Sequence, residues 1–374
     1  MRVLLVFGTR PEAIKMAPVY EELHRRGDLF RCKVCVTAQH RQMLDSVLDL
    51  FEIQSDYDLD IMAPDQSLER LTAELLERLP PVLAEEQPDV VLVQGDTTTA
   101  MVAAICAYYQ QIRIGHVEAG LRSANMYSPF PEEINRRVVS HLAQYHFAPT
   151  ERAREGLLRE GVAEDAIAVT GNTVIDALLD LVERARRLST PPEPVADLAW
   201  SEKRVVLITG HRRESFGEPL RRVCMAFRSL AQSNRDVEFV YPVHLNPNVR
   251  APVNEILSGL SNFHLVEPLD YLSFVWCMDH SYLIITDSGG IQEEAPSLGK
   301  PVLVTRDVTE RREGIEAGTA KLVGTDQDRI VAETQALLDN REQYEAMSCA
   351  VNPYGDGHAA ERIIDFLAAR ARDS

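Results

Sequence analysis

Short runs of apolar, β-branched residues alternate with longer amphipathic segments from one end of the chain to the other. The short runs are apolar at almost every position, which is typical of strands buried on both faces of a parallel sheet. The longer segments have apolar residues at the three- and four-residue spacing of a helix. This alternation predicts an α/β fold of βαβ units, with helices on both faces of each sheet. The predicted strands are residues 2–8, 31–37, 88–95, 112–118, 204–210, 237–243, 263–268, 282–287 and 301–304, and the predicted helices include residues 12–26, 41–51, 68–83 and 220–231.

One segment interrupts this pattern near the middle of the chain. Residues 189–203 are rich in proline and precede a new strand, which is typical of a linker between domains. We therefore predict two Rossmann-like domains, residues 1–170 and 171–357, with the junction near residues 170–200. A helical pattern returns at residues 358–371, after a turn at residues 352–357.

The charge of the chain excludes some classes of partner. The 374 residues include 39 lysines and arginines against 57 aspartates and glutamates, a net charge of −18. This disfavours nonspecific binding to nucleic acid or to an anionic membrane, since both require a basic surface. The amino terminus lacks the apolar run of a signal peptide, and six scattered cysteines are typical of a reducing compartment. We expect a cytoplasmic protein in which Cys32 and Cys35 are buried thiols, without a metal site.

The first predicted strand leads directly into a turn of small residues. Gly8 and Thr9 form this turn, Pro11 suits the first helical position, and Arg10 lies at the start of the helix. Lys15 follows about one turn later. Because the start of a helix exposes unpaired N–H groups and the positive end of its dipole, it favours an anion. The pattern predicts that Arg10 and Lys15 bind a diphosphate, against the simpler possibility of a solvated arginine at a helix terminus.

A second strand, in the other half of the chain, leads into a similar turn. Residues 288–290 (Ser-Gly-Gly) offer backbone N–H groups at close approach, and Glu293 and Glu294 follow inside the helix. A carboxylate at this position can bind the two hydroxyls of a ribose. Two such turns facing one cleft would hold a nucleotide diphosphate between the two domains.

Further polar residues follow predicted strands or open helices. His211 ends a strand, where α/β sheets bind their ligands, and two arginines follow it. Asp96 and Glu118 also end strands, and Glu132 and Glu133 open a helix. Any one of these carboxylates could simply cap a helix or complement its dipole. Three such sites at strand ends or loops of one domain favour acid–base chemistry.

Some familiar motifs are missing from the sequence. No G-x-G-x-x-G follows a strand, and no Walker A sequence occurs. No tyrosine is followed four places later by a lysine, so the arrangement of NAD-dependent sugar epimerases is missing as well. We therefore expect no cofactor and no metal.

Many stretches resemble, in order, the non-hydrolysing UDP-N-acetylglucosamine 2-epimerases of bacteria, over essentially the whole chain. The resemblance implies the two-domain GT-B-like fold of metal-independent glycosyltransferases, with the parallel sheets facing a central cleft and the last helix, residues 358–374, packed on the first domain. It also implies a homodimer that serves polysaccharide biosynthesis. The matching stretches are FGTRPEAIKMAP, TAQHRQMLD, QGDTTTAM, HVEAGLRS, YSPFPEEINR, TGNTVIDAL, TGHRRESFGEP, YPVHLNPNVR, IITDSGGIQEEAPSLGKPVLV and NPYGDG.

The resemblance also implies roles for individual residues. By it, the family's catalytic residues correspond to Asp96, Glu118, Glu132 and His211, and Phe274 lies near the uracil. A second, regulatory UDP-GlcNAc site found in some members corresponds to Gln39, Gln42, Arg212 and His244. The residues that the resemblance assigns to UDP are Arg10, Lys15, His211, Phe274, Ser288, Gly289, Gly290, Glu294 and Arg311.

The implied reaction interconverts UDP-GlcNAc and UDP-ManNAc without NAD. The C2 proton of the sugar is not acidic, so UDP would leave C1 first and give a 2-acetamidoglucal, to which UDP adds back. Three alternatives use the same residues. A GT-B glycosyltransferase would need an acceptor, a hydrolysing 2-epimerase would release free ManNAc, and a UDP-sugar sensor would have no use for the carboxylates.

Overall fold

The computed structural model describes residues 1–37, 41–61, 66–123, 125–210, 212 and 215–371, with the backbone alone at 41–43. The chain divides into two compact units, Met1–Ala177 with Gly355–Ser374, and Leu178–Tyr354. The division falls within helix α7 (Thr173–Arg186), not in the proline-rich segment that predicted a linker. That segment packs inside the second unit, where the Trp200 ring lies edge-on to Trp276 with centroids 5.0 Å apart.

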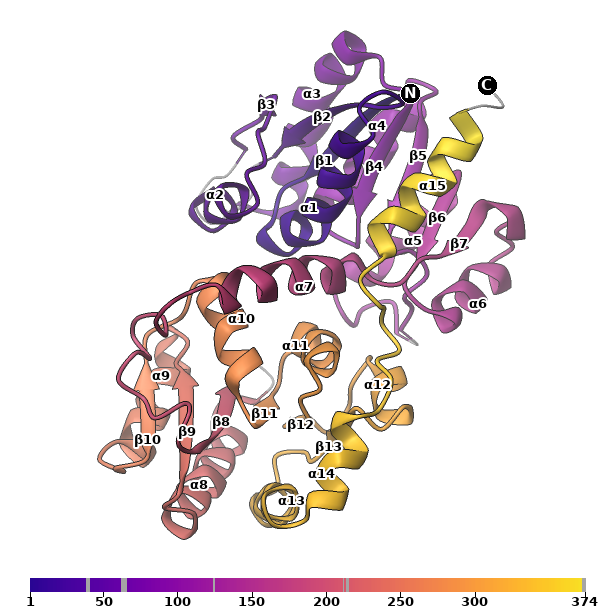
Figure 1. Ribbon diagram of the computed structural model, residues 1–374. Helices are drawn as coiled ribbons and strands as arrows, with labels where there is room; N and C mark the ends of the chain where they lie inside the picture. Colours follow the sequence, from indigo (N-terminus) through magenta and orange to yellow (C-terminus); the bar gives the residue numbers. More distant parts are fainter. Residues whose placement is uncertain (38–40, 62–65, 124, 211, 213–214, 372–374) are drawn as a thin grey trace. The chain divides into compact units, whose positions relative to one another are not determined.

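The first unit is built on a parallel sheet of seven strands in the order β3-β2-β1-β4-β5-β6-β7 (Figure 1). Its strands are β1 (Arg2–Phe7), β2 (Arg31–Val36), β3 (Tyr57–Asp58), β4 (Val90–Gln94), β5 (Arg113–Val117), β6 (Tyr145–Ala148) and β7 (Ile167–Val169). Its helices, besides α7, are α1 (Arg10–Arg25), α2 (Arg41–Leu50), α3 (Leu68–Glu86), α4 (Thr98–Tyr109), α5 (Glu132–Leu142), α6 (Glu151–Arg159), the short 3₁₀ helix η1 (Glu164–Ala166) and α15 (Ala359–Ala371).

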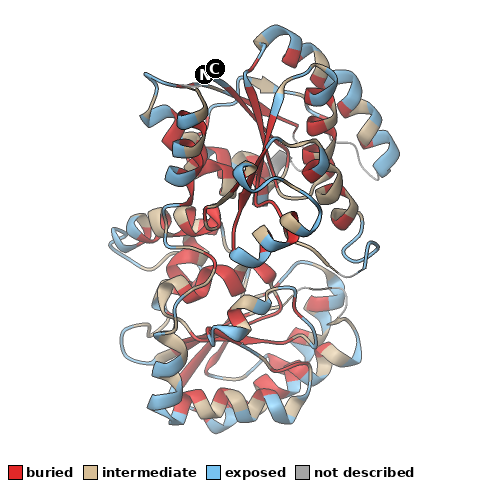
Figure 2. Ribbon diagram, turned by 90° about the vertical axis from the view of Figure 1, so that its right-hand side faces the viewer, coloured by how far each residue is buried: buried red, intermediate tan, exposed pale blue. Residues whose placement is uncertain are grey.

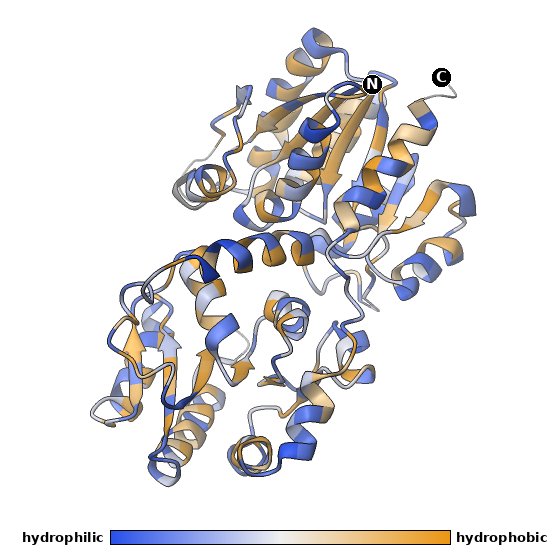
Figure 3. Cartoon of the chain, in the orientation of Figure 1, coloured by the Kyte–Doolittle hydropathy of each residue, from blue (hydrophilic) through white to orange (hydrophobic). Residues whose placement is uncertain are grey.

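Helices cover both faces of this sheet. Residues of α3 and α4 pack against Leu4, Val6, Val91 and Val93 of the central strands. Helix α15 lies beside α1, and its Phe366 ring meets the ring of Phe147 edge-on at 5.4 Å. Strand β4 is buried at every position, and β1 at every position but its first (Figure 2). The same strands are largely hydrophobic (Figure 3). Burial on both faces therefore explains why these strands read as continuous apolar runs.

The second unit repeats this architecture with a parallel sheet of six strands in the order β10-β9-β8-β11-β12-β13. Its strands are β8 (Arg204–Thr209), β9 (Val237–Pro242), β10 (Phe263–Val266), β11 (Leu283–Thr286), β12 (Val302–Val304) and β13 (Ala320–Leu322). Its helices are α8 (Glu218–Ser233), α9 (Pro247–Leu257), α10 (Tyr271–His280), α11 (Gly289–Glu294), the 3₁₀ helix η3 (Ala295–Leu298), α12 (Arg312–Glu316), α13 (Gln327–Asp339) and α14 (Arg341–Ser348). Helix α8 packs between α9 and α13 over a core that includes Phe227, Phe239 and Tyr241.

Each sheet has one strand from which the chain order of the strands proceeds in opposite directions on the two sides. In the first unit β1 is flanked by β2 and β4, and in the second unit β8 is flanked by β9 and β11. Loops that leave such neighbouring strands diverge, and ligands of open α/β sheets bind in the crevice that this creates at the carboxyl ends. We therefore expect ligand-binding residues in the turns after β1 and β4, and in those after β8 and β11. In the described part of the chain, no helix combines the length and apolar character needed to cross a membrane.

Candidate active site

The turn after β1 is built from close contacts that only a small residue allows. A Cβ on Gly8 would lie 1.9 Å from the hydroxyl of Thr37, so any side chain there would force the turn apart. The Glu12 carboxylate accepts hydrogen bonds from the N–H groups of Gly8 (3.1 Å) and Thr9 (2.8 Å), which is half of a capping box. Helix α1 begins at Arg10, one residue before Pro11, which the sequence favours as the first helical position. The turn therefore leaves Arg10 half-buried at the helix start.

Glu118 lies at the centre of a buried polar cluster. It follows β5 in a left-handed backbone conformation (φ 63°), which is uncommon for a residue other than glycine. Its carboxylate pairs with the Lys15 ammonium at 2.6 Å and accepts hydrogen bonds from the side-chain amides of Gln94 and, at 3.3 Å, Asn172. Three donors around one carboxylate stabilise its ionised form. Lys15, which the sequence assigns to a diphosphate, is thus held against Glu118.

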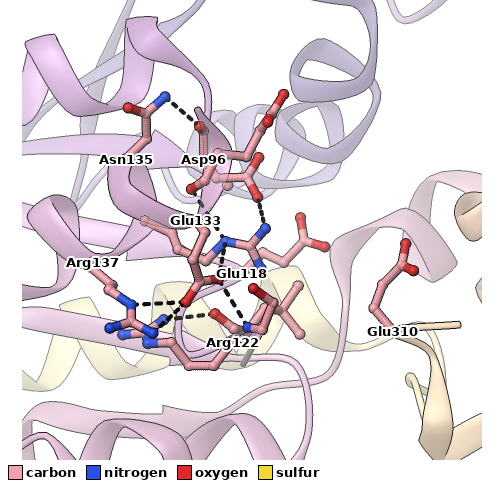
Figure 4. Close-up of polar contacts among 12 residues, drawn as sticks. Asp96, Glu118, Arg122, Glu133, Asn135, Arg137 and Glu310 are labelled. Carbon is pink, nitrogen blue, oxygen red and sulfur yellow. Dashed lines mark hydrogen bonds and ion pairs between the residues drawn. The ribbon is translucent and has the colours of Figure 1, made fainter. Parts of the chain in front are cut away.

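Asp96 follows β4 and points toward the same region (Figure 4). Its carboxylate pairs with the Arg136 guanidinium at 2.8 Å, and its backbone carbonyl accepts a hydrogen bond from the Asn135 amide at 2.9 Å. Burial raises the pKa of Asp96, and the negative charges of Glu118 and Glu132 raise it further, whereas Arg136 opposes the rise. A carboxyl group whose pKa is raised by burial and by neighbouring carboxylates is a candidate for proton transfer near neutral pH.

The two glutamates that open α5 have different surroundings. Glu133 is fully buried, accepts a hydrogen bond from the Ser123 N–H at 2.9 Å and pairs with Arg137 at 2.8 Å (Figure 4). Its carboxylate is therefore occupied in fixing the loop before α5 to the helix. Glu132 is only half-buried and is close enough to Asp96 to influence its pKa. The structure thus brings Asp96, Glu118 and Glu132 together in the first unit.

In the second unit, basic side chains surround the turn after β11. A Cβ on Gly289 would lie 3.6 Å from both the Arg212 and the Arg311 guanidinium groups, and 3.3 Å from the Glu310 carboxylate. Burial raises the pKa of Glu310, but the charges of Arg311, Arg306 and Arg212, with a backbone hydrogen bond, outweigh this and lower it. Such a concentration of guanidinium groups beside a glycine turn is suited to a phosphate.

The residues that flank this turn have partners within the protein. Arg311 donates a hydrogen bond to the buried Glu293 at 2.6 Å, and the Tyr271 hydroxyl donates one to Glu294 at 2.7 Å. Phe274 is half-buried in α10, one helical turn from Tyr271. Glu294, predicted to bind a ribose, lies beside the same turn, since its carboxylate would be 3.2 Å from a Cβ on Gly290.

Some predicted site residues lie outside the described residues. These are His211 and Gln39, together with the side chain of Gln42. Of the two remaining residues assigned to a regulatory site, Arg212 donates its backbone N–H to Asp287 at 2.8 Å. His244 lies in the exposed loop after β9, where its Nδ1 accepts a hydrogen bond from the Asn246 N–H at 3.1 Å.

Several residues that hold the predicted carboxylates, or the turn that carries Asp96, were not predicted. Nothing in the sequence shows which group each of them contacts, and only the folded chain brings them to Asp96, Glu118 or Thr97. Among the described residues, no group of three histidine, cysteine or acidic side chains could hold a metal ion. The residues that were missed are Glu12, Gln94, Asn135, Arg136 and Asn172.

Comparisons with known proteins point to one family. A family model described as UDP-N-acetylglucosamine 2-epimerase matches residues 21–368. A UDP-N-acetylglucosamine 2-epimerase of Escherichia coli strain K12 is 57% identical over 370 residues, which cover 98% of each chain.

Solved structures are similar over the whole chain as well. A UDP-GlcNAc 2-epimerase from Neisseria meningitidis, crystallised with UDP-GlcNAc bound, superposes with a TM-score of 0.91 at 51% identity, covering 99% of this chain and all of that one. A UDP-GlcNAc 2-epimerase from Methanocaldococcus jannaschii, solved with UDP-GlcNAc and UDP, gives a TM-score of 0.80 at 32% identity, covering 99% of this chain and all of that one.

Proposed function

We propose that this chain, which belongs to the UDP-N-acetylglucosamine 2-epimerase family, interconverts UDP-GlcNAc and UDP-ManNAc by inverting C2 of the sugar without hydrolysing it. The reaction is an isomerisation, and we assign it to the elimination and re-addition of UDP. The observation that carries the proposal is the group formed by Asp96, Glu118 and Glu132 in the first unit, where burial and mutual repulsion raise the pKa of Asp96.

The leaving group would be bound by the turn after β11. We assign the diphosphate to the N–H groups of residues 288–290 and to Arg311, because guanidinium groups surround that turn. Arg10 and Lys15 of the first unit are assigned to the same UDP, with Glu294 on the ribose and Phe274 on the uracil. These donors would stabilise the charge that develops on the diphosphate as the C1–O bond breaks.

Loss of UDP makes the chemistry at C2 possible. The C2–H bond is not adjacent to a carbonyl, so a carboxylate could not remove its proton from the intact sugar at a useful rate. Positive charge at C1 acidifies this proton, and a carboxylate then takes it to give a 2-acetamidoglucal. A proton returned to the opposite face of C2, with re-addition of UDP at C1, completes the inversion.

The three carboxylates, with His211, supply the proton-transfer groups of this scheme. Glu118 is held by Lys15, Gln94 and Asn172, which favour its ionised form and suit it to act as a base or to stabilise positive charge. Burial raises the pKa of Asp96, which favours proton exchange by this carboxyl group. Both roles require the intermediate to be protected from water.

Four finer assignments complete the proposal. We propose that the protein works in the cytoplasm as a homodimer and supplies an activated sugar for polysaccharide biosynthesis. A second UDP-GlcNAc molecule would bind a regulatory site that includes Gln39, Gln42, Arg212 and His244. Dependence of the reverse reaction on traces of added UDP-GlcNAc would support this site.

Incubation of the purified protein with UDP-GlcNAc alone tests the function. We expect part of the UDP-GlcNAc to be converted to UDP-ManNAc until a constant mixture is reached, without added metal or nicotinamide. Separation of the products by ion-exchange chromatography distinguishes the alternatives. Stoichiometric release of free ManNAc and UDP would identify a hydrolysing enzyme, and turnover that appears only with an added sugar acceptor would identify a glycosyltransferase.

A further inference from the structure

We propose that Glu12, His116 and Asn135 are positioning residues that together fix the backbone of residues 95–97, and thereby the carboxylate of Asp96. Each comes from a different element, α1, β5 and α5, and each is at most 3% exposed. The inference rests on the proposed function, because it explains how one of the carboxylates assigned to proton transfer is held in place.

The three side chains bind three successive residues of the turn after β4. His116 Nε2 lies 2.7 Å from the carbonyl oxygen of Gly95, Asn135 Nδ2 donates to the carbonyl of Asp96 at 2.9 Å, and Glu12 accepts from the Thr97 hydroxyl at 2.7 Å. The Gly95 N–H donates to the Val117 carbonyl at 2.9 Å, which joins the turn to β5 as well. Residues 95–97 are thus hydrogen-bonded to side chains or backbone groups of α1, β5 and α5.

The Glu12 carboxylate joins two turns that meet where the strand order reverses. One oxygen accepts from the N–H groups of Gly8 and Thr9 after β1, and the other accepts from Thr97 after β4. Burial raises the pKa of Glu12, and these hydrogen bonds oppose the rise. A buried carboxyl group is costly unless its hydrogen bonds are satisfied, and a capping box at the surface would stabilise α1 without that cost. We therefore infer that the buried Glu12 carboxylate does more than cap α1. It also links the turn that contains Asp96 to the turn that precedes Arg10.

His116 is suited to its contact because it remains neutral. Burial lowers the pKa of its imidazole to about 3, so the ring is uncharged at neutral pH. The contact with the Gly95 carbonyl requires the proton on Nε2, and this fixes the tautomer. Gly95 has a left-handed backbone (φ 68°), and the neutral donor holds its carbonyl in that conformation without adding a charge beside Asp96.

Fixing this backbone matters because Asp96 lies just beyond the end of β4, where the strand no longer holds the chain. Its side chain is short, so a shift of its Cα moves the carboxylate by a similar distance. A displacement of about 1 Å in a reacting group can cost about 10²-fold in rate. Glu12, His116 and Asn135 act on the position of Asp96 and do not contact the substrate. Their loss should therefore lower turnover and leave nucleotide affinity unchanged.

Two pairs of uncharged variants test this positioning role. Thr97→Val removes the hydroxyl that donates to Glu12 and that also accepts the Ala100 N–H as the cap of α4, and Thr97→Ser keeps both contacts. The stability lost with the cap is measured by thermal unfolding. Asn135→Leu removes the amide that binds the Asp96 carbonyl, and Asn234→Leu is its control, because Asn234 is also buried and donates to a backbone carbonyl, that of Leu230, but lies in the second unit. Turnover is measured with UDP-GlcNAc, UDP affinity by calorimetry and folding by thermal unfolding.

We expect Thr97→Val and Asn135→Leu to lower kcat by about 10- to 100-fold, with UDP affinity within about threefold of wild type. Thr97→Ser should restore most of the turnover, and Asn234→Leu should lower stability without lowering kcat. If Thr97→Val or a folded Asn135→Leu turns over like wild type, the inference is wrong. The Thr97 pair decides the matter alone if Asn135→Leu does not fold. A wild-type protein that fails to epimerise UDP-GlcNAc would instead refute the proposed function.

Discussion

Asp96→Asn is expected to lower turnover of UDP-GlcNAc by about 10²-fold or more, the usual cost of losing a general acid or base. The substitution removes the titratable group with little change in shape, and Arg136 can still donate to the remaining oxygen. UDP affinity should stay near the wild-type value, because the diphosphate is assigned to other residues. Steady-state kinetics and calorimetry on the same preparation separate these two effects.

Glu118→Gln and Glu132→Gln complete the series, with different expectations for their side effects. A glutamine at position 118 cannot accept from all the donors around it, so the Lys15 ammonium loses its counter-charge. We therefore expect Glu118→Gln to change UDP affinity as well as turnover, and Glu132→Gln to change turnover alone. Glu160→Gln is a matched control, because Glu160 pairs with Arg122 in the same unit and has no assigned role. Near-wild-type turnover in all three variants would remove these catalytic assignments.

The second large effect concerns the cations assigned to the diphosphate. Arg10→Ala is expected to weaken UDP binding by about 1.5–3 kcal/mol, the range for a hydrogen bond to a charged group. Arg311 needs a different design, because its guanidinium pairs with the buried Glu293, and breaking a buried pair by removing one partner costs about 3–5 kcal/mol of stability. We therefore compare Arg311→Met/Glu293→Gln with Glu293→Gln alone.

Calorimetry with UDP checks both substitutions. Arg341→Ala serves as the control, because the Arg341 side chain is 88% exposed and pairs with Glu345 of the same helix. Unchanged UDP affinity in Arg10→Ala and in the Arg311 double variant would show that the diphosphate binds elsewhere. If only the Arg311 double variant loses UDP affinity, the cations that bind the diphosphate belong to the second unit alone.

Much of the fold could be predicted from the sequence because its strands are buried on both faces. Such strands read as continuous apolar runs, and the α/β fold with two parallel sheets that they predict is confirmed, as is the family. The two units divide between Ala177 and Leu178, inside the predicted junction of residues 170–200 but before the proline-rich segment. Prolines break helices and strands wherever they occur, so they mark an irregular segment whether it joins two units or, as here, packs within one.

The site was partly predictable for a different physical reason. Charged residues at strand ends and helix starts are visible in a sequence. Asp96 and Glu118 became candidates because they follow predicted strands, and Glu132 because it opens a predicted helix. The residues that hold them were not, because a buried amide such as Asn135 or Asn172 looks like any polar residue until its partner is known. Glu12 is the clearest case. It looks like the ordinary third residue of a capping box, and only the fold shows that its second oxygen reaches Thr97. The roles of all these residues stay predictions.

The measurement that tests the central claim most directly is the fate of the C2 hydrogen. If UDP leaves first and a side chain removes the C2 proton, that proton can exchange with solvent before a proton returns to the other face. The reaction run in D₂O should therefore place one deuterium at C2 of the UDP-ManNAc formed and none at C3 or C4, as proton NMR and mass spectrometry will show. UDP-ManNAc that retains the original hydrogen at C2 would contradict the elimination mechanism.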